Sequence, residues 1–198
     1  MKVFQVEGEW NREHLRLSSR PDPQPGAGEV RVAMRAAALN YRDLLVPQRG
    51  YGARMQALPL IMLSDGVGVV DAVGPGVRTI ALGDRVCPLF FQSWQGGPAN
   101  AERLSRSLGC ETDGTMADYR VFPECGVARV PAHLDDFQAA TLPTAAVTAW
   151  RALLGAGRVC PGDTVLVQGT GGVSLFALQF AKLAGCQVIV TSSSDAKL

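Results

Sequence analysis

A short glycine-rich segment late in the chain limits the possible folds of this sequence more than any other feature. Residues 164–167 form an apolar run typical of a buried parallel strand, and residues 169–174 read Gly-Thr-Gly-Gly-Val-Ser. Apolar residues then recur every three or four positions until Gly185, which predicts an amphipathic helix, and residues 188–191 predict the next strand. A strand, a glycine turn, a helix and a strand within about 28 residues make up a βαβ unit.

The glycine turn matches the dinucleotide-binding pattern G-x-G-x-x-G except at its third glycine, where Ser174 stands. The first glycine of the pattern allows a tight turn, and the next lets the backbone approach a diphosphate. The start of the following helix offers free N–H groups to that anion. We therefore predict a diphosphate site made by Gly169, Thr170, Gly171, Gly172 and Val173; the alternative is a glycine-rich connection that binds no ligand.

The residues after the second strand indicate which nicotinamide dinucleotide would bind. An acid at this place accepts hydrogen bonds from a ribose 2′-hydroxyl and repels a 2′-phosphate. Here Ser192 and Ser193 take that place and Lys197 follows, so that hydroxyls and a cation are available to a phosphate. NADP is therefore predicted in preference to NAD. Asp195 argues against this prediction, and a solvated serine loop without function is the alternative.

The first part of the chain, residues 1–131, has short β-branched runs separated by glycine and proline. This pattern predicts a small, irregular β-barrel, with strands at residues 30–34 and 67–73 and a further one beginning at Asp84. Residues 40–45 are predicted to form a helical turn with Asn40 as its N-cap. Residues 92–113 are polar and rich in glycine, and we predict a long excursion that is not part of the core.

The pattern changes after residue 131. Residues 137–142 follow Asp135 and Asp136, and residues 145–154 follow Thr144, so each run of helix formers has an N-cap candidate ahead of it. The fold class is thus α/β plus β. The predicted domains are residues 1–131, the β-barrel, and residues 132–198, which contain the βαβ unit.

Composition excludes several classes of protein. Lys and Arg number 19 against 18 Asp and Glu, and no basic stripe is visible, which argues against nucleic acid as a partner. No apolar run approaches the roughly 18 residues of a membrane span, and the N-terminus lacks the apolar region of a secretory signal. The five cysteines are far apart and form no C-x-x-C pair, unlike those of a disulfide scaffold or a zinc finger. We expect a cytoplasmic protein without a membrane partner.

Several motifs together resemble the medium-chain dehydrogenase/reductase superfamily. They are Gly66-Val67-Gly68-Val69-Val70, Val73-Gly74-Pro75-Gly76-Val77, Gly83-Asp84-Arg85-Val86, Gly114-Thr115-Met116-Ala117-Asp118-Tyr119, Ala140-Thr141-Leu142-Pro143 and the segment from Pro161 to Val173. The resemblance implies a GroES-like catalytic domain followed by the first βαβ part of a Rossmann domain. It also implies that substrate and nicotinamide meet between the two domains. The family continues beyond the second Rossmann strand, so the resemblance also implies a C-terminally truncated form.

The resemblance further implies a branch without zinc. Positions that hold the catalytic metal in zinc-dependent relatives align with Asn40, Ser64 and Thr144, none of which is a thiolate or an imidazole. The closely spaced cysteines of a structural zinc loop are also absent. Both histidines, His14 and His133, lie elsewhere. The chain therefore resembles the zinc-independent quinone-oxidoreductase branch.

Site residues follow from the same resemblance. Asn40 would donate to a developing oxyanion, Tyr41 would shape the pocket or pass a proton, and Asp43 would orient its neighbours. The alternatives are an N-cap for Asn40 and core packing for Tyr41. Thr148 matches a residue that lies against the nicotinamide in relatives, with an ordinary helix threonine as its alternative. Three aromatic residues would line a substrate pocket or belong to the core: Phe90, Phe91 and Trp94.

We thus expect an NADP-dependent, zinc-independent oxidoreductase that transfers a hydride between nicotinamide and a small-molecule quinone, enone, aldehyde, ketone or alcohol. The alternatives are an inactive remnant that acts as a binding module and a zinc-type alcohol dehydrogenase. A parallel sheet that ends after residues 188–190 has an uncovered apolar edge, which predicts a homo-oligomer.

Overall fold

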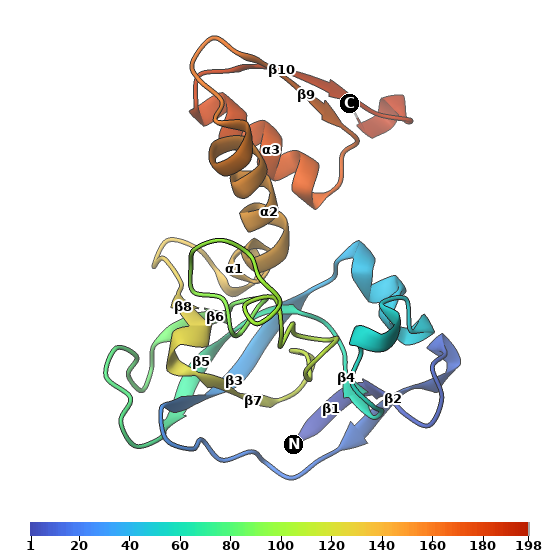
Figure 1. Cartoon of the computed structure of the whole chain (residues 1–198), viewed down its shortest axis with the longest axis vertical. Coiled ribbons are helices and arrows are strands. Elements are labelled where there is room, and N and C mark those ends of the chain that lie inside the picture. Colours follow the sequence, from blue (N-terminus) through green and yellow to red (C-terminus); the bar gives the residue numbers. More distant parts are fainter. Residues whose placement is uncertain (198) are drawn as a thin grey trace. The chain divides into compact units, whose positions relative to one another are not determined.

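The structure is a computed structural model that describes residues 1–197. It divides into two compact units, Met1–Pro143 and the part of the chain from Thr144 onward, shown in blue to yellow and in orange to red in Figure 1. The units are described separately below. The domain boundary expected at residues 131 and 132 stays a prediction, because division by compactness is a different criterion.

The first unit consists of two antiparallel sheets. One has the strand order β2-β1-β4, and the other has the order β7-β3-β5-β6-β8. The register of β3 and β5 pairs Val30 with Val73 and Ala38 with Asp65, and it shifts twice, once by an extra residue in β5 and once by an extra residue in β3. The predicted irregular β-barrel is therefore confirmed as a half-barrel of antiparallel strands. The strands are β1 (Lys2–Val6), β2 (Leu15–Ser19), β3 (Glu29–Ala38), β4 (Leu60–Ile61), β5 (Asp65–Val73), β6 (Arg85–Pro88), β7 (Tyr119–Pro123) and β8 (Val127–Arg129).

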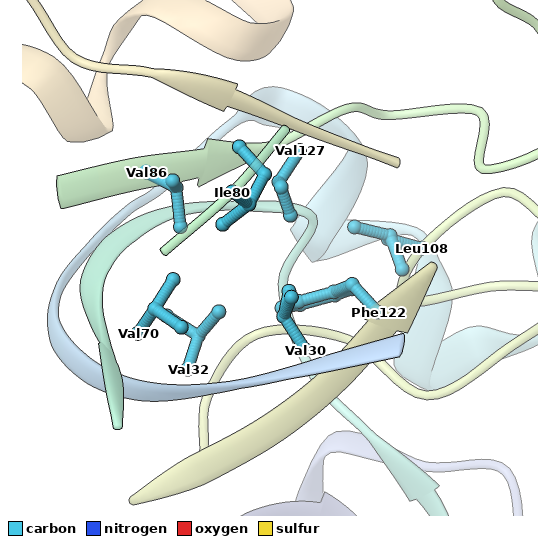
Figure 2. Packing of buried hydrophobic residues seen from close by; sticks show 8 residues of the cluster. All are labelled: Val30, Val32, Val70, Ile80, Val86, Leu108, Phe122 and Val127. Carbon is cyan, nitrogen blue, oxygen red and sulfur yellow. The ribbon is translucent and has the colours of Figure 1, made fainter. Parts of the chain in front are cut away.

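Buried hydrophobic side chains, most of them from the larger sheet, form the main core (Figure 2). Alternate residues of a strand face the same side, so that Val30 and Val32 of β3 meet Val70 of β5. The cluster contains Val30, Val32, Val70, Ile80, Val86, Leu108, Phe122 and Val127. Leu108 corrects the sequence-based prediction. It lies in the 92–113 excursion, yet it is 1% exposed, because this segment folds back and fills the end of the core.

Short helices connect and cover these strands. A second cluster includes Val46, Leu60 and Cys110, and it links the helical turns to β4. The helix α1 (Asp136–Ala140) begins at Asp135, whose carboxylate accepts a hydrogen bond of 2.7 Å from the Gln138 N–H, as predicted for an N-cap. The 3₁₀ turns are η1 (Arg12–His14), η2 (Tyr41–Leu44), η3 (Val46–Gln48), η4 (Gly52–Arg54) and η5 (Glu124–Gly126).

The helical run at the unit boundary differs from the prediction. It passes from the π-helical η6 (Leu142–Ala146) through α2 (Val147–Trp150) into the π-helical η7 (Arg151–Gly157). Thr144 was expected to cap a helix starting at residue 145, which is wrong, because Thr144 lies inside η6. The wider π turns extend the helix in both directions. Trp150 of α2 packs edge-on against Phe180, with ring centroids 5.3 Å apart.

The second unit contains the predicted βαβ arrangement. The strands β9 (Thr164–Gln168) and β10 (Gln187–Thr191) are parallel, with Leu166 opposite Ile189. The helix α3 (Gly172–Leu183) packs on β9 and β10. Its residue Ala181 belongs to a small buried core that also contains Leu153 and Cys186. A 3₁₀ turn, η8 (Asp195–Lys197), follows β10. Within residues 1–197, no helix is long and apolar enough to cross a membrane.

Candidate functional site

The glycine turn stands at the carboxyl ends of the two parallel strands. Gly169 has φ +87°, a conformation that a residue with a side chain rarely adopts. Its N–H donates a 2.8 Å hydrogen bond to the carbonyl of Thr191, which joins the end of β9 to the end of β10. The turn therefore lies where ligands bind in open α/β sheets.

The N-terminus of α3 carries no side-chain cap. Gly171 is the N-cap residue, and no side chain accepts a hydrogen bond from the first turn of the helix. The first N–H groups of a helix lack partners within the helix and carry a partial positive charge. Gly171, Gly172 and Val173 are exposed. This arrangement can accept an anion such as a diphosphate.

Ser174, the departure from the fingerprint, has a definite structural role. Its hydroxyl donates a 3.0 Å hydrogen bond to the carbonyl of Gln168 at the end of β9. A hydroxyl in place of the third glycine thus joins the helix to the strand, and α3 still packs on β9. The sequence suggested that a small side chain is tolerated here, but it did not suggest this hydrogen bond.

The serine segment lies next to the glycine turn. Ser192 follows Thr191 directly, and its hydroxyl accepts a 3.1 Å hydrogen bond from the Ser194 N–H. Ser193 and Lys197 are exposed. The structure therefore brings two predicted groups together within the second unit, the glycine turn and the segment from Ser192 to Lys197.

Thr148 lies on the exposed side of α2. The residue one helical turn earlier packs near the glycine turn, since a β-carbon built on Gly172 would stand 3.5 Å from the β-carbon of Ala145. Thr148 belongs to the same unit as the predicted cofactor site, and its role at a nicotinamide stays a prediction.

In the first unit, the residues after β3 form a tight polar turn. The Asn40 N–H donates a 2.8 Å hydrogen bond to Oδ2 of Asp43, and the Asp43 N–H donates to the Asn40 carbonyl at 2.9 Å. Asn40 is thus in the N-cap position of η2, as predicted. The side-chain nitrogen Nδ2 of Asn40 is buried and has no hydrogen-bond partner in the structure. A buried donor of this kind lowers the stability of the fold unless another group accepts a hydrogen bond from it.

Two carboxyl groups, one in this turn and one near it, are buried. Asp43 is 8% exposed, and Asp65, at the start of β5, is 0% exposed. Ser64 is equally buried, and its hydroxyl donates to Oδ1 of Asp65 at 3.3 Å. Burial raises the pKa of Asp43, and the negative charge of Asp65 adds to this effect, while the Asn40 N–H and Arg42 oppose it. Asp43 holds the Asn40 N–H by a hydrogen bond, and its orienting role at a substrate stays a prediction.

Arg42 is a residue that sequence reasoning missed. Its guanidinium lies over the rings of Phe90, at 4.8 Å, and Tyr51, at 5.4 Å. One N–H donates to the carbonyl of Leu108 at 3.1 Å, so that Arg42 attaches the 92–113 excursion to the Asn40 turn. An arginine between Tyr41 and Asp43 was the available signal, but its aromatic partners are distant in sequence.

The aromatic residues show mixed outcomes. Tyr41 is 78% exposed, so the alternative of core packing is wrong, while its predicted catalytic role stays a prediction. Phe90 and Phe91 form an edge-to-face pair with ring centroids 4.6 Å apart, and the ring centroids of Phe91 and Trp94 are 5.9 Å apart. A groove of about 320 Å³ lies elsewhere, beside β1, part of β3 and residues 115–118, and it contains none of the predicted site residues.

The three positions that were aligned with zinc ligands carry none of the usual zinc-binding side chains. Asn40, Ser64 and Thr144 offer an amide and two hydroxyls, whereas protein zinc sites use thiolate, imidazole or carboxylate. Among residues 1–197, no group of three or more His, Cys, Asp or Glu side chains gathers in one place. The zinc-independent branch stays a prediction.

Residues 26–132 match the family model of the alcohol dehydrogenase GroES-like domain. The chain is 46% identical over 173 residues to a zinc-type alcohol dehydrogenase-like protein of Schizosaccharomyces pombe. The aligned region covers 86% of this chain and 50% of that protein. It is 32% identical over 206 residues to an acryloyl-coenzyme A reductase of Sulfurisphaera tokodaii, covering 100% of this chain and 60% of that one. The crystal structure of a putative alcohol dehydrogenase from Sinorhizobium meliloti superimposes with a TM-score of 0.91 at 42% identity, covering 98% and 57% of the two chains. The chain thus spans about half the length of the curated relatives it matches.

Proposed function

The chain belongs to the alcohol dehydrogenase GroES-like family of oxidoreductases, and from this membership we propose that it serves NADP-dependent hydride transfer without zinc. The substrate class is a small carbonyl compound, quinone or enone, with alcohol oxidation as the reverse reaction. The similar proteins support an oxidoreductase that depends on a nicotinamide dinucleotide, and one of them is named an acryloyl-coenzyme A reductase. The choice of NADP, the absence of zinc and the substrate class are the proposal.

The buried side-chain nitrogen of Asn40 is the observation that carries the proposed substrate site. It is a hydrogen-bond donor without an acceptor, at the end of β3 and beside the buried Asp43. When a carbonyl gains a hydride, negative charge develops on its oxygen, and a preorganised donor stabilises that charge. Asn40 donates to this oxygen, and Asp43 holds the Asn40 backbone through the 2.8 Å hydrogen bond.

The cofactor would be held by the second unit. The exposed N–H groups at the start of α3 bind the diphosphate, and Gly169 and Gly171 allow its close approach. Ser193 and Lys197 bind the 2′-phosphate, while the Ser192 hydroxyl keeps its segment folded through Ser194. The nicotinamide supplies the hydride when it is bound. The protein residues named above would bind and orient the cofactor.

Activity decides the first part of the proposal. NADPH oxidation is measured with a panel of quinones, enones and aldehydes, using this chain and one continued past residue 198. The Asn40→Ala variant should lose about 10²-fold in kcat, since one oxyanion donor is removed. Asn100→Ala, in the exposed excursion, is the matched control and should keep the activity. No turnover by the longer chain with any acceptor would remove the enzyme proposal.

Metal analysis tests the zinc-independent part. The names of two similar curated relatives favour a zinc-type enzyme, whereas the donor set at Asn40, Ser64 and Thr144 favours one without zinc. Dialysis against a chelator should leave the activity unchanged. Stoichiometric zinc in the purified protein, lost together with activity, would establish the zinc-type alternative.

Dinucleotide titration tests the cofactor choice. NADPH should bind more tightly than NADH. Lys197→Ala should narrow this difference in affinity, because it removes the proposed contact of Lys197 with the 2′-phosphate, worth roughly 1.5–3 kcal/mol. Lys182→Ala is the matched control, because Lys182 lies in the last turn of α3, away from its N-terminus. Equal or tighter binding of NADH would refute the preference for NADP.

A homo-oligomer is the proposed assembly. Leu166 and Ile189, opposite each other on β9 and β10, are 57% and 53% exposed and form an apolar sheet face. Association of copies would cover this face. Light scattering that finds a monomer at micromolar concentration would contradict it.

A further inference from the structure

Two cysteines that are 26 residues apart in the sequence meet at the amino ends of β9 and β10. Cys186 directly precedes β10, and its thiol lies 3.5 Å from the carbonyl oxygen of Cys160. Both residues are free thiols. This contact belongs to the end of the sheet opposite the glycine turn, so neither the substrate site nor the cofactor site uses it.

The backbone holds the two cysteines beside each other. A turn closed by the hydrogen bond from the Asp163 N–H to the Cys160 carbonyl, at 3.1 Å, folds Cys160 back next to Asp163. Asp163 in turn accepts from the Gln187 N–H at 2.8 Å, which places it opposite Cys186. The Gly162 N–H donates to the Gly185 carbonyl at 3.0 Å. Three backbone hydrogen bonds therefore keep the turn and the start of β10 in register.

The two thiols differ in their access to solvent. Cys160 is exposed, and Cys186 is 6% exposed. An exposed thiol can be attacked by an oxidant, and a second thiol close by can then resolve the product. The Cys160 sulfur lies 3.6 Å from the Arg158 carbonyl oxygen, and it must leave this contact to bond with the Cys186 sulfur.

We propose that Cys160 and Cys186 form a redox-active pair that hydrogen peroxide converts into an intramolecular disulfide. The Cys160 thiol loses its proton, its thiolate attacks one peroxide oxygen, and the O–O bond breaks. The leaving hydroxide takes up that proton, so a sulfenic acid and water form. The Cys186 sulfur then attacks the sulfenic sulfur, the S–O bond breaks, and the Cys186 proton leaves with the hydroxide as a second water. Two thiols are oxidised by two electrons, and one peroxide is reduced to two waters.

The remaining cysteines are unsuited to this reaction. Cys87 and Cys110 are buried in the first unit, and burial raises the pKa of both thiols. Cys125 is exposed, also in the first unit, and its sulfur accepts a hydrogen bond from Gln95. Cys125 is therefore the matched control, an exposed cysteine in the same chain without a resolving thiol in contact.

Peptide mapping tests the proposal directly. The reduced chain is treated with hydrogen peroxide, free thiols are alkylated, and the protein is digested with trypsin without reduction. Cleavage after Arg158, Lys182 and Lys197 places the two cysteines on separate peptides, residues 159–182 and 183–197. We expect these peptides to be joined, with the loss of two hydrogens, and to separate after reduction. Oxidation of Cys160 to a sulfinic or sulfonic acid with Cys186 still free would overturn the proposal.

Variants and denaturant show whether the native fold brings the pair together. Cys160→Ser and Cys186→Ala should each abolish the joined peptides, while Cys125→Ser should leave their yield unchanged. In urea the yield should fall several-fold, because the thiols are no longer adjacent. An unchanged yield in urea, or a cross-link between two chains, would overturn the proposal.

The cross-link would enclose the glycine turn and α3 within one covalent loop. Such a loop restricts the unfolded chain, so the oxidised protein should unfold at a higher temperature than the reduced one. The difference should vanish in Cys160→Ser. A lower unfolding temperature after oxidation would show that the native geometry does not accommodate the bond.

Discussion

Gly74 lies so close to the backbone of Gly26 that a β-carbon built on Gly74 would stand 1.7 Å from the Gly26 carbonyl oxygen. Two hydrogen bonds of 2.8 Å support this approach, from the Gly74 N–H to Glu29 and from the Gly28 N–H to Pro75. The end of β5 is thereby joined to the segment that leads into β3. The motif Val73-Gly74-Pro75-Gly76 thus has a packing reason within the half-barrel.

Gly74→Ala should destabilise the first unit by about 3 kcal/mol, because the backbone must move to admit the methyl group. Gly96→Ala is the control, since a β-carbon at Gly96 meets no atom within 4 Å and the backbone there is unstrained. Its effect should stay within about 0.5 kcal/mol. Urea unfolding of both variants measures the difference, and equal stability of the two would contradict the close approach.

Ser174→Ala should lower the stability of the second unit by about 0.5 kcal/mol, the lower part of the range for one hydrogen bond, because the site is partly solvated. Ser174→Thr retains the hydroxyl and should be less affected. Thermal unfolding distinguishes the two variants. If alanine were the more stable, the hydrogen bond to Gln168 would be of no consequence.

Glu124 should make the stability of the first unit depend on acid pH. Its carboxylate accepts hydrogen bonds from the Arg78, Thr79 and Ile80 N–H groups and the Thr79 hydroxyl, which lower its pKa from 4.5 to about 2. A carboxyl with a lower pKa in the folded state stabilises that state above pH 4.5. The contribution is lost as the pH falls from 4.5 toward 2.

Glu124→Gln should therefore unfold at a lower temperature than the parent chain at pH 7, and the difference should shrink at pH 3. Glu102→Gln, in the exposed excursion, serves as the control. A difference that grows on acidification would mean that the Glu124 carboxylate is not stabilising.

Arg158→Gly should stabilise the end of η7 by about 0.5–1 kcal/mol. Arg158 is exposed and has φ 50°, the left-handed conformation that ends the helix and that glycine adopts without steric cost. Arg158→Ala removes the same side chain but keeps the β-carbon, so it should bring no gain. Thermal unfolding of the three proteins gives the test, and equal gains would indicate that the guanidinium matters instead.

Cys87 should resist thiol reagents at pH 8. Burial raises the pKa of its thiol from 9.0 to about 12, so the reactive thiolate is scarce, and the sulfur donates to the Ala139 carbonyl at 3.3 Å. Cys125 should be alkylated much faster. Timed alkylation followed by peptide mass spectrometry measures both rates, and similar rates would show that the helix α1 does not protect Cys87.

Features that depend on neighbouring residues were predictable from the sequence. The βαβ unit follows from apolar periodicity and from glycines at a strand end. The start of α1 follows from Asp135, an N-cap candidate ahead of a run of helix formers, and the Asn40 turn follows from its own N-cap candidate. The NADP preference and the catalytic role of Asn40 go beyond this local information and remain proposals.

Tertiary packing alone decided the surroundings of the candidate substrate site. Arg42 donates to Leu108 across 66 residues of sequence and lies over Phe90 and Tyr51. No periodicity encodes such partners, because they meet only after the strands have paired and the long connection has closed. The same reason explains why Leu108 is in the core.

The amino-acid sequence by itself determined the strands at residues 30–34 and 67–73, the βαβ unit and the glycine turn, through local hydrogen bonds and side-chain alternation. The burial of Asp43 and the unpaired amide of Asn40 arose only when distant segments excluded water from them.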